Sequence, residues 1–354
     1  MYTVRDTEGA ARLGNGGAGV SRRAFLGGSA AAAAALVLAG CGRNDASAPS
    51  RSADGSVTKI NTGNLVGGCM SSLFLAHGMG YFGQEGLEVN LNTFGNAGDN
   101  LSSLVSGATQ VIHNPFSNTF VGREKGEPLV IVAGSGKLGL EVVARGGSGI
   151  RTLDDLTARK GKGVKVGTAR VNTQELTLFH LLKSKGLGYS DFEMVYFTDN
   201  LALGQALINN DVDVATVVQP YAAQVVTQAN GVYLGTNETA WGPEAPDCMV
   251  TVKESVLDTK PDWLVRYLRA LLAAEDSFSS DPAAAVKVLA DGKYFKVEGK
   301  ALEEGVRRQP PQVRLPGPAL AALEVGLGDM RELGYLKSVT SSQVMNLSML
   351  QGLS

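Results

Sequence analysis

The chain has 354 residues, of which 44% are hydrophobic and 19% are charged, and its net charge is −2. At roughly 150 residues per domain, this length allows two domains that each bury a core. The balanced charge argues against a nucleic-acid-binding protein, which normally carries a basic excess.

The first 40 residues carry the features of a bacterial export signal. Arg22 and Arg23, followed by Ala-Phe-Leu, resemble the twin-arginine export motif. The apolar run at residues 27–39 is shorter than the ~20 residues of a membrane span. Leu38-Ala39-Gly40-Cys41 resembles a lipobox, which implies a lipidated Cys41 at the mature N-terminus. We therefore predict a signal peptide at residues 1–40 and a flexible, lipid-anchored tether at residues 41–56.

From Val57 onward, short β-branched runs alternate with amphipathic stretches, which is typical of an α/β protein. The predicted strands are Thr58–Asn61, Leu87–Asn92, Gln110–His113, Leu129–Ala133, Glu141–Ala144, Val164–Gly167, Glu193–Tyr196, Val212–Val218 and Met249–Val252. The predicted helices between them are Ser72–Gly80, Asn100–Ser106, Thr173–Lys185, Ala202–Asn209 and Tyr221–Gln228. After Lys253 the pattern is helical, at Pro261–Ser279, Pro282–Ala290, Glu298–Arg307 and Pro318–Leu333.

Once Cys41 is assigned to a lipid, two cysteines remain, Cys69 and Cys248. They are too few for a disulfide scaffold or a four-cysteine metal site. In an oxidising compartment they either pair or stay as buried thiols, and we favour free thiols. The chain has no Cys-x-x-Cys, His-x-x-x-His or Gly-x-Ser-x-Gly motif. We therefore predict no catalytic residue, no metal and no cofactor.

Four segments of the folded part form an ordered set of motifs. They are Leu75–Val89, Leu101–Val111, Ile150–Val166 and Ala206–Ala215, followed by Gln219-Pro220. The first is similar to "Ala-x-x-x-Gly-Phe-Phe-x-x-Glu-Gly-Leu-x-Val", and the last to "Ala-Leu-x-x-Gly-x-Val-Asp-Ala". Together, between Val57 and Leu333, they resemble the solute-binding proteins of bacterial ABC importers, in the nitrate/sulfonate/taurine and thiamine-precursor branch. Departures at Ser72, Gln110 and Gln219 leave the ligand undetermined.

This resemblance implies a two-lobe α/β fold of the periplasmic-binding-protein type II class. Lobe 1 would combine residues 57–143 with the mostly helical residues 248–354, and lobe 2 would be residues 144–247. The crossing segments would lie near Glu141–Arg145 and Cys248–Val252, and a hinge would close the lobes around a ligand.

Ligands of open α/β sheets lie beyond the carboxyl ends of strands, beside helix N-termini. The candidate ligand-binding residues at such places are Cys69, Met70, Ser71, Ser72, His113, Asn114, Phe116, Ser117, Arg170, Asn172, Thr173, Gln219 and Tyr221. Arg170 beside a helix start favours a carboxylate or sulfonate, although a neutral heterocycle stays open. Structural roles stay open too, because Ser72 and Thr173 suit helix caps and aromatic side chains suit a core.

The resulting hypothesis is a monomeric, lipid-anchored extracytoplasmic receptor. It captures a small organic anion, either a sulfonate or a carboxylate and with or without an aromatic ring, and delivers it to an ABC permease and its ATPase. No nucleic acid is involved, and the membrane is reached through the lipid alone.

Two alternatives remain. Gly134-Ser135-Gly136-Lys137-Leu138-Gly139 matches the Gly-x-Gly-x-x-Gly motif of dinucleotide-dependent oxidoreductases, with Asp154 twenty residues further on. That motif should open a helix, whereas Glu141–Ala144 is predicted as a strand. A lipoprotein that senses a solute without transporting it would share the fold.

Overall fold

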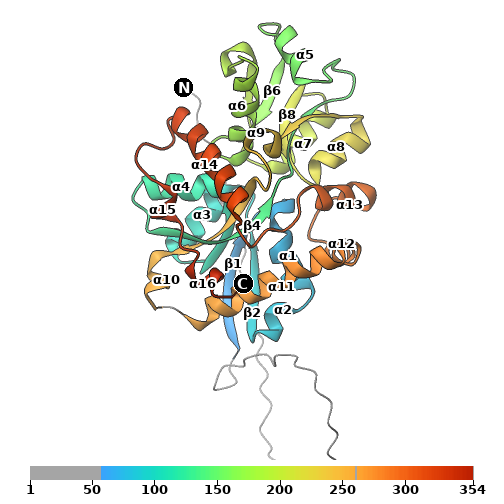
Figure 1. Cartoon of the computed structure of the whole chain (residues 1–354). Helices are drawn as coiled ribbons and strands as arrows, with labels where there is room; N and C mark the ends of the chain where they lie inside the picture. Colours follow the sequence, from blue (N-terminus) through green and yellow to red (C-terminus); the bar gives the residue numbers. More distant parts are fainter. Residues whose placement is uncertain (1–56, 260, 354) are drawn as a thin grey trace, which may run out of the picture. The chain divides into compact units, whose positions relative to one another are not determined.

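The computed structural model describes residues 57–259 and 261–353. The predicted export motif, the lipidation of Cys41 and the tether lie outside these residues. The described chain forms two five-stranded sheets with helices packed against them. In Figure 1 the labelled strands of the first sheet lie in the lower half and those of the second in the upper half.

Each sheet combines parallel strands with one antiparallel strand. In the first sheet the order is β2 (Leu87–Thr93), β1 (Thr58–Asn64), β3 (Val111–Pro115), β10 (Pro246–Lys253) and β4 (Leu129–Lys137). In the second it is β7 (Glu193–Tyr196), β6 (Lys165–Thr168), β8 (Val214–Val218), β5 (Leu140–Ala144) and β9 (Val232–Thr236). β10 and β5 are the antiparallel strands. All residues of β5 and β8 are buried, which explains why apolar residues predominate in both strands.

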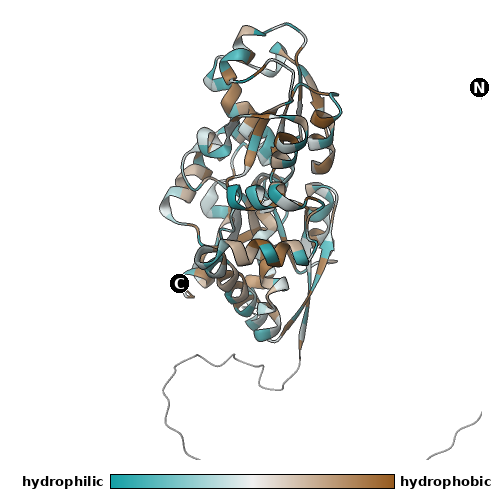
Figure 2. Ribbon diagram, turned by 90° about the vertical axis from the view of Figure 1, so that its right-hand side faces the viewer, coloured by the Kyte–Doolittle hydropathy of each residue, from teal (hydrophilic) through white to brown (hydrophobic). Residues whose placement is uncertain are grey.

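The helices near the first sheet are η1 (Gly68–Met70), α1 (Ser71–Gly78), α2 (Tyr81–Gln84), α3 (Ala97–Ser106), α4 (Phe116–Glu124), α10 (Glu254–Thr259), α11 (Asp262–Ser280), α12 (Pro282–Asp291), α15 (Ser341–Val344) and α16 (Ser348–Gln351). Those near the second are α5 (Leu153–Ala158), α6 (Thr173–Ser184), η2 (Tyr189–Asp191), α7 (Asn200–Ile208), α8 (Tyr221–Ala229) and α9 (Asn237–Trp241). Hydrophilic and hydrophobic residues alternate along many of these helices, as Figure 2 shows, because one face packs inward.

The C-terminal helices α13 (Gly299–Arg308) and α14 (Gly317–Glu332) connect the two parts. α13 packs on α8, and α14 packs on α6 and α9. The segment predicted to complete lobe 1 therefore also contacts helices of the second sheet. No helix in the described part of the chain is both long and apolar enough to span a membrane.

The predicted strands and helices are present, with boundary differences of a few residues. The sequence analysis missed β9, the nine-residue helix α4 and the shorter helices α2, α5, α9, α10, α15, α16, η1 and η2. β9 is only half-buried and contains Gly235, so its pattern is weak. α4 contains Ser117, Asn118 and Thr119 in its first turns, residues that compete with the backbone and favour loops.

The chain changes sheet earlier than predicted. β5 lies wholly in the second sheet, so the first change occurs at Leu138–Gly139 rather than at Glu141–Arg145. β10 lies wholly in the first sheet, so the second change falls within residues 242–245 rather than at Cys248–Val252. The two changeover segments run side by side, since Leu138 N–H donates to the carbonyl oxygen of Ala245 over 2.8 Å. The two crossing segments are therefore neighbours in space, although they are about 100 residues apart in the sequence.

Candidate functional site

A groove of about 750 Å³ lies between elements of the two sheets. One wall comes from α3, α4 and the turn after α4, and the other from the segments that follow β6 and β7. Its apolar surface includes Leu101, Val105 and Val121, and Asn96 and Asn118 add amide groups. The volume lies within the range of small-molecule pockets, about 300–1,000 Å³. The groove is therefore large enough for a small organic solute.

The charged side chains that line this groove are Arg170, Lys125 and Glu127. The guanidinium carbon of Arg170 lies 4.7 Å from the ring centroid of Tyr196, which is a cation–π distance. A hydrogen bond with Tyr335 and the nearby Tyr196 and Glu175 raise the pKa of Arg170, so its positive charge is maintained. The lining residues thus carry one more positive than negative charge.

Asn172 belongs to both the groove and a deeper cavity of about 10 Å³ between the sheets. Its side chain caps α6 by accepting a hydrogen bond from Gln174 N–H over 3.2 Å. The next residue, Thr173, donates its hydroxyl to a carboxylate oxygen of Asp247 over 2.6 Å. The N-terminus of α6 is therefore tied to the segment that enters β10.

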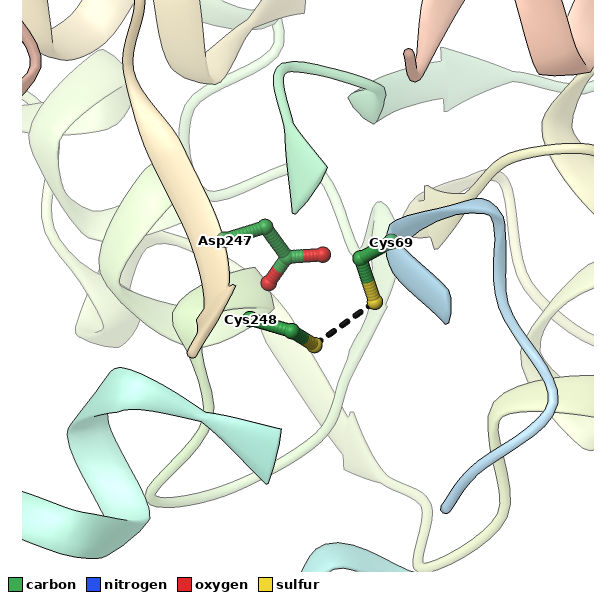
Figure 3. Close-up of side chains that lie close together, drawn as sticks. All are labelled: Cys69, Asp247 and Cys248. Atoms are coloured by element: carbon green, nitrogen blue, oxygen red, sulfur yellow. Dashed lines mark hydrogen bonds between the residues drawn. The ribbon is translucent and has the colours of Figure 1, made fainter. Parts of the chain in front are cut away.

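The deeper cavity is lined by Cys69, Asp247 and Cys248 together with residues of the second sheet. Figure 3 shows the two sulfur atoms facing each other beside the carboxylate. Burial raises the pKa of Asp247 to about 6, although hydrogen bonds from Thr173 and Gln309 oppose that shift. Burial also raises the pKa of the Cys69 thiol to about 12, so both thiols of this pair are protonated at neutral pH.

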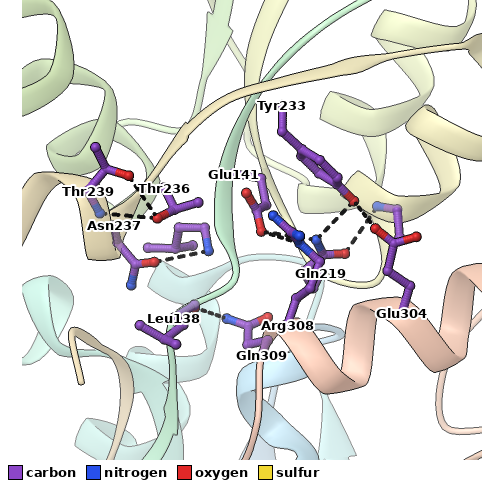
Figure 4. A network of polar contacts seen from close by, with 12 residues as sticks. Leu138, Glu141, Gln219, Tyr233, Thr236, Asn237, Thr239, Glu304, Arg308 and Gln309 are labelled. Carbon is purple, nitrogen blue, oxygen red and sulfur yellow. Dashed lines mark hydrogen bonds and ion pairs between the residues drawn. The ribbon is translucent and has the colours of Figure 1, made fainter. Parts of the chain in front are cut away.

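A polar network next to the crossing joins α13 to the second sheet (Figure 4). The Arg308 guanidinium donates to Glu141 over 2.8 Å and lies 4.1 Å from the ring centroid of Tyr233. Gln219 donates to the same Glu141 oxygen over 3.3 Å. Gln309, at the end of α13, donates to the carbonyl oxygen of Leu138 and to Asp247. These contacts connect the crossing segment, the second sheet and the deeper cavity.

The structure brings together some of the predicted site residues. Arg170 and Asn172 line the groove, and Asn172 and Cys69 line the deeper cavity. Thr173 lines neither space, but its hydroxyl donates to Asp247, which lines the deeper cavity. The Ser117 hydroxyl donates to the Val171 carbonyl oxygen across the cleft over 3.3 Å.

Other predicted residues line neither space. They are Met70, Ser71, Ser72, His113, Asn114, Phe116, Gln219 and Tyr221. Phe116 packs edge-on against Phe120 and Trp241, the ordinary role of an aromatic in a core. Asn114 is fully buried and donates to the Ala97 carbonyl oxygen over 3.2 Å, which fixes the start of α3.

His113 belongs to a buried network inside the first sheet's half. Its Nδ1 lies 2.6 Å from the Ser135 hydroxyl and its Nε2 lies 2.9 Å from the Tyr267 hydroxyl. Burial lowers the pKa of His113 to about 3, so the ring stays neutral. A neutral, doubly hydrogen-bonded imidazole in this position serves the fold.

The sequence analysis overlooked Tyr196, Asp247 and Gln309 at the site. Tyr196 is the last residue of a predicted strand, and an aromatic side chain at such a position could have been predicted as a site residue. Asp247 and Gln309 are 62 residues apart, and no local pattern relates them.

The Gly-x-Gly-x-x-Gly match does not open a helix, because residues 134–137 belong to β4 and β5 follows at Leu140. A Cβ at Gly136 would lie 2.5 Å from Cys69 Cα, and one at Gly134 would lie 2.3 Å from the Gln312 carbonyl oxygen. These glycines allow close backbone packing, so they do not form a phosphate-binding turn.

A family model described as NMT1/THI5 like matches residues 70–285, more than half of the chain. The chain belongs to the NMT1/THI5-like family. Comparison with curated protein sequences found no match.

Solved structures similar to this NMT1/THI5-like protein include a ligand-binding component of an ABC-type import system from Staphylococcus aureus, with zinc bound. It is 16% identical, covers 84% of this chain and 99% of its own, and has a TM-score of 0.73. The alkanesulfonate-binding protein SsuA from Xanthomonas axonopodis pv. citri, bound to MOPS, is 16% identical, with 82% and 99% coverage and a TM-score of 0.68. The desulfurization enzyme DSZB is 14% identical, with 83% and 98% coverage and a TM-score of 0.60.

At these identities the likenesses show the fold. The predicted two-lobe α/β fold of the periplasmic-binding-protein type II class is confirmed for this NMT1/THI5-like chain. Binding proteins and an enzyme both occur among its structural relatives.

Proposed function

We propose that this protein is the extracytoplasmic solute-binding component of an ABC importer. It captures a small organic anion, a sulfonate or a carboxylate, in the groove between its two sheets and delivers it to the permease. The observation that carries this proposal is Arg170, held over Tyr196 at the edge of a groove of about 750 Å³. Family membership and two structural relatives described as binding proteins support it.

The groove suits a solute with an anionic head and an apolar body. Arg170 offers a planar set of N–H donors that match a carboxylate or sulfonate. Leu101, Val105 and Val121 offer apolar contact, and Phe197 and Tyr196 add aromatic surface beside the arginine. Because apolar side chains surround a few polar groups, shape sets the fit and Arg170 sets the charge preference.

Several buried polar atoms near the deeper cavity have no hydrogen-bond partner among the described residues. They include Gln174 Oε1, in the cavity lining, and Gln309 Oε1, whose amide nitrogen donates to Asp247 there. Buried polar atoms are normally paired, so such atoms suit a site where a polar ligand or water supplies the partner. In the groove itself, Asn118 Oδ1 is likewise buried without a partner among the described residues, which favours a polar ligand group there.

A thermal-shift screen of the chain from residue 57 onward tests the function. The panel contains alkyl and aryl sulfonates, carboxylates, nitrate and neutral heterocycles. A ligand that binds the folded chain raises its melting temperature by mass action, in a saturable manner. If no solute raises it, and an oxidoreductase assay with nicotinamide or flavin cofactors shows turnover, the receptor proposal fails.

Replacement of the cleft arginine, Arg170→Ala, tests the anion preference. We expect about a tenfold or greater loss of affinity for the best anionic ligand, since a hydrogen bond to a charged group contributes roughly 1.5–3 kcal/mol. Arg170→Lys should lose less, because the charge stays while the planar donor pair is lost. Isothermal titration gives the affinities, with the exposed Arg151→Ala as control. Equal affinity in Arg170→Ala and Arg151→Ala would remove Arg170 from the site.

A further inference from the structure

Cys69 and Cys248 are 179 residues apart in sequence, yet their sulfur atoms lie 2.6 Å apart in a buried place between β10 and the segment after β1. Their exposed fractions are 4% and 1%. We propose that these two cysteines are the site of an intramolecular disulfide in the folded, exported chain. In the structure both are free thiols, as the sequence analysis favoured, and the proposal is that they become oxidised. It rests on the extracytoplasmic location proposed above, because disulfides persist in oxidising compartments.

The backbone around Gly136 explains why the two sulfur atoms meet. Gly136 pairs with Cys248 across β4 and β10, and the Cα of Cys69 lies against the same glycine. A Cβ at Gly136 would be 2.5 Å from that Cα, so only glycine lets the segment come this close. The Ser135 hydroxyl also donates to the Cys69 carbonyl oxygen over 2.7 Å. Cys69 of η1 and Cys248 of β10 are thus both held against the same two residues of β4, Ser135 and Gly136.

The step from dithiol to disulfide is a thiol–disulfide exchange with an oxidant of the disulfide class. One cysteine sulfur attacks a sulfur of the oxidant and forms a mixed disulfide, and the first oxidant thiol leaves. The second cysteine sulfur then attacks the first and releases the other oxidant thiol. One S–S bond forms and one breaks, two electrons pass to the oxidant, and the two cysteine protons end on its two thiols.

The geometry of this cluster favours a disulfide over a metal site. Asp247 lies beside the pair, and the three side chains place one ligand atom each within 4.8 Å of the others. Two sulfur ligands of tetrahedral zinc, at about 2.3 Å from the metal, would stand about 3.7 Å apart. The present separation is 2.6 Å and the adjoining cavity holds about 10 Å³, so a metal would force this packed site apart.

The bond would also fix one wall of the cleft. Cys69 lies in η1, directly before α1, and Cys248 follows Asp247, which accepts hydrogen bonds from Thr173 and Gln309. A disulfide here ties the segment after β1 to β10, whose Asp247 accepts a hydrogen bond from Thr173 at the start of α6. The wall of the proposed solute site is then preorganised.

The test uses the full chain carrying Cys41→Ser, so that Cys69 and Cys248 are its remaining cysteines. The reduced, unfolded chain is refolded with mixed oxidised and reduced glutathione, then unfolded again and treated with iodoacetamide. Intact mass should show a monomer two hydrogens lighter than the reduced chain, with no alkyl group added. Its urea midpoint should exceed that of the same chain kept in reductant. Cys69→Ala and Cys248→Ala should each take one alkyl group and lose the redox dependence.

Alkylation of both cysteines after refolding, or one glutathione on each, would overturn the proposal. Retention of one zinc ion per chain after refolding with zinc, with both native thiols protected, would overturn it in favour of a metal site. None of these measurements of the cysteines uses a solute. A chain that forms the bond but binds no solute contradicts the receptor function alone, and a chain that binds solute with two free thiols contradicts the disulfide alone.

Discussion

The free energy of unfolding of the reduced wild-type chain is expected to fall relative to that of Asp247→Asn as the pH rises from about 4 to about 6. Burial raises the pKa of Asp247 from 3.8 to about 6 in the folded chain. Between these pH values the unfolded chain has lost this proton and the folded chain still holds it, so raising the pH favours unfolding. Above about pH 6 both states are ionised and the loss is complete. Its total should be about 3 kcal/mol.

Asparagine is the suitable reference because it fits the same contacts without titrating. Its oxygen can accept from Gln309, and its amide can donate to the Thr173 hydroxyl, which already lies 3.1 Å from Asn172 Oδ1. Urea unfolding of both chains at several pH values, with reductant present, gives the difference curve, from which other titrating groups cancel. A difference that stays flat between pH 4 and pH 7 would show that Asp247 has an ordinary pKa.

Arg308→Ala should destabilise the chain by about 2 kcal/mol, because it leaves the Glu141 carboxylate buried without its ion-pair partner. Glu141 is 1% exposed, and one of its oxygens already has no partner among the described residues. Loss of the stacking contact with Tyr233 adds to the effect. The value is below the ~3–5 kcal/mol of a fully buried pair, since the Arg308 side chain is 36% exposed.

The neighbouring residue provides the control. Arg307 pairs with Glu303 at the surface, where both side chains are about half exposed, so Arg307→Ala should change stability by under about 0.5 kcal/mol. Adding Glu141→Gln to Arg308→Ala should recover part of the loss, because the buried charge is removed. Urea unfolding measures all four chains. If Arg307→Ala and Arg308→Ala have equal effects, the network at the crossing does not depend on a buried charge.

Residues that are close in sequence explain what was predictable of the site. Arg170 and Asn172 lie between the end of β6 and the start of α6, so the order of strand and helix alone predicted both at the cleft. The same rule placed Cys69 after β1. The rule does not say which way a side chain at a strand end turns, and those of His113 and Phe116 contact Tyr267 and Trp241 inside the fold. Tertiary packing makes that choice.

The sequence by itself determined the α/β class, since strands and helices carry different repeats of apolar residues, and the family resemblance implied the two lobes. Such patterns are local, and the ordered motifs add the family. Tertiary structure alone decided where the chain crosses between sheets, at two segments joined by the hydrogen bond between Leu138 and Ala245. It also decided that Cys69 meets Cys248, because Gly136 admits a backbone from far along the chain. Contacts between distant segments leave no periodic trace in the sequence, so they follow only from the folded chain.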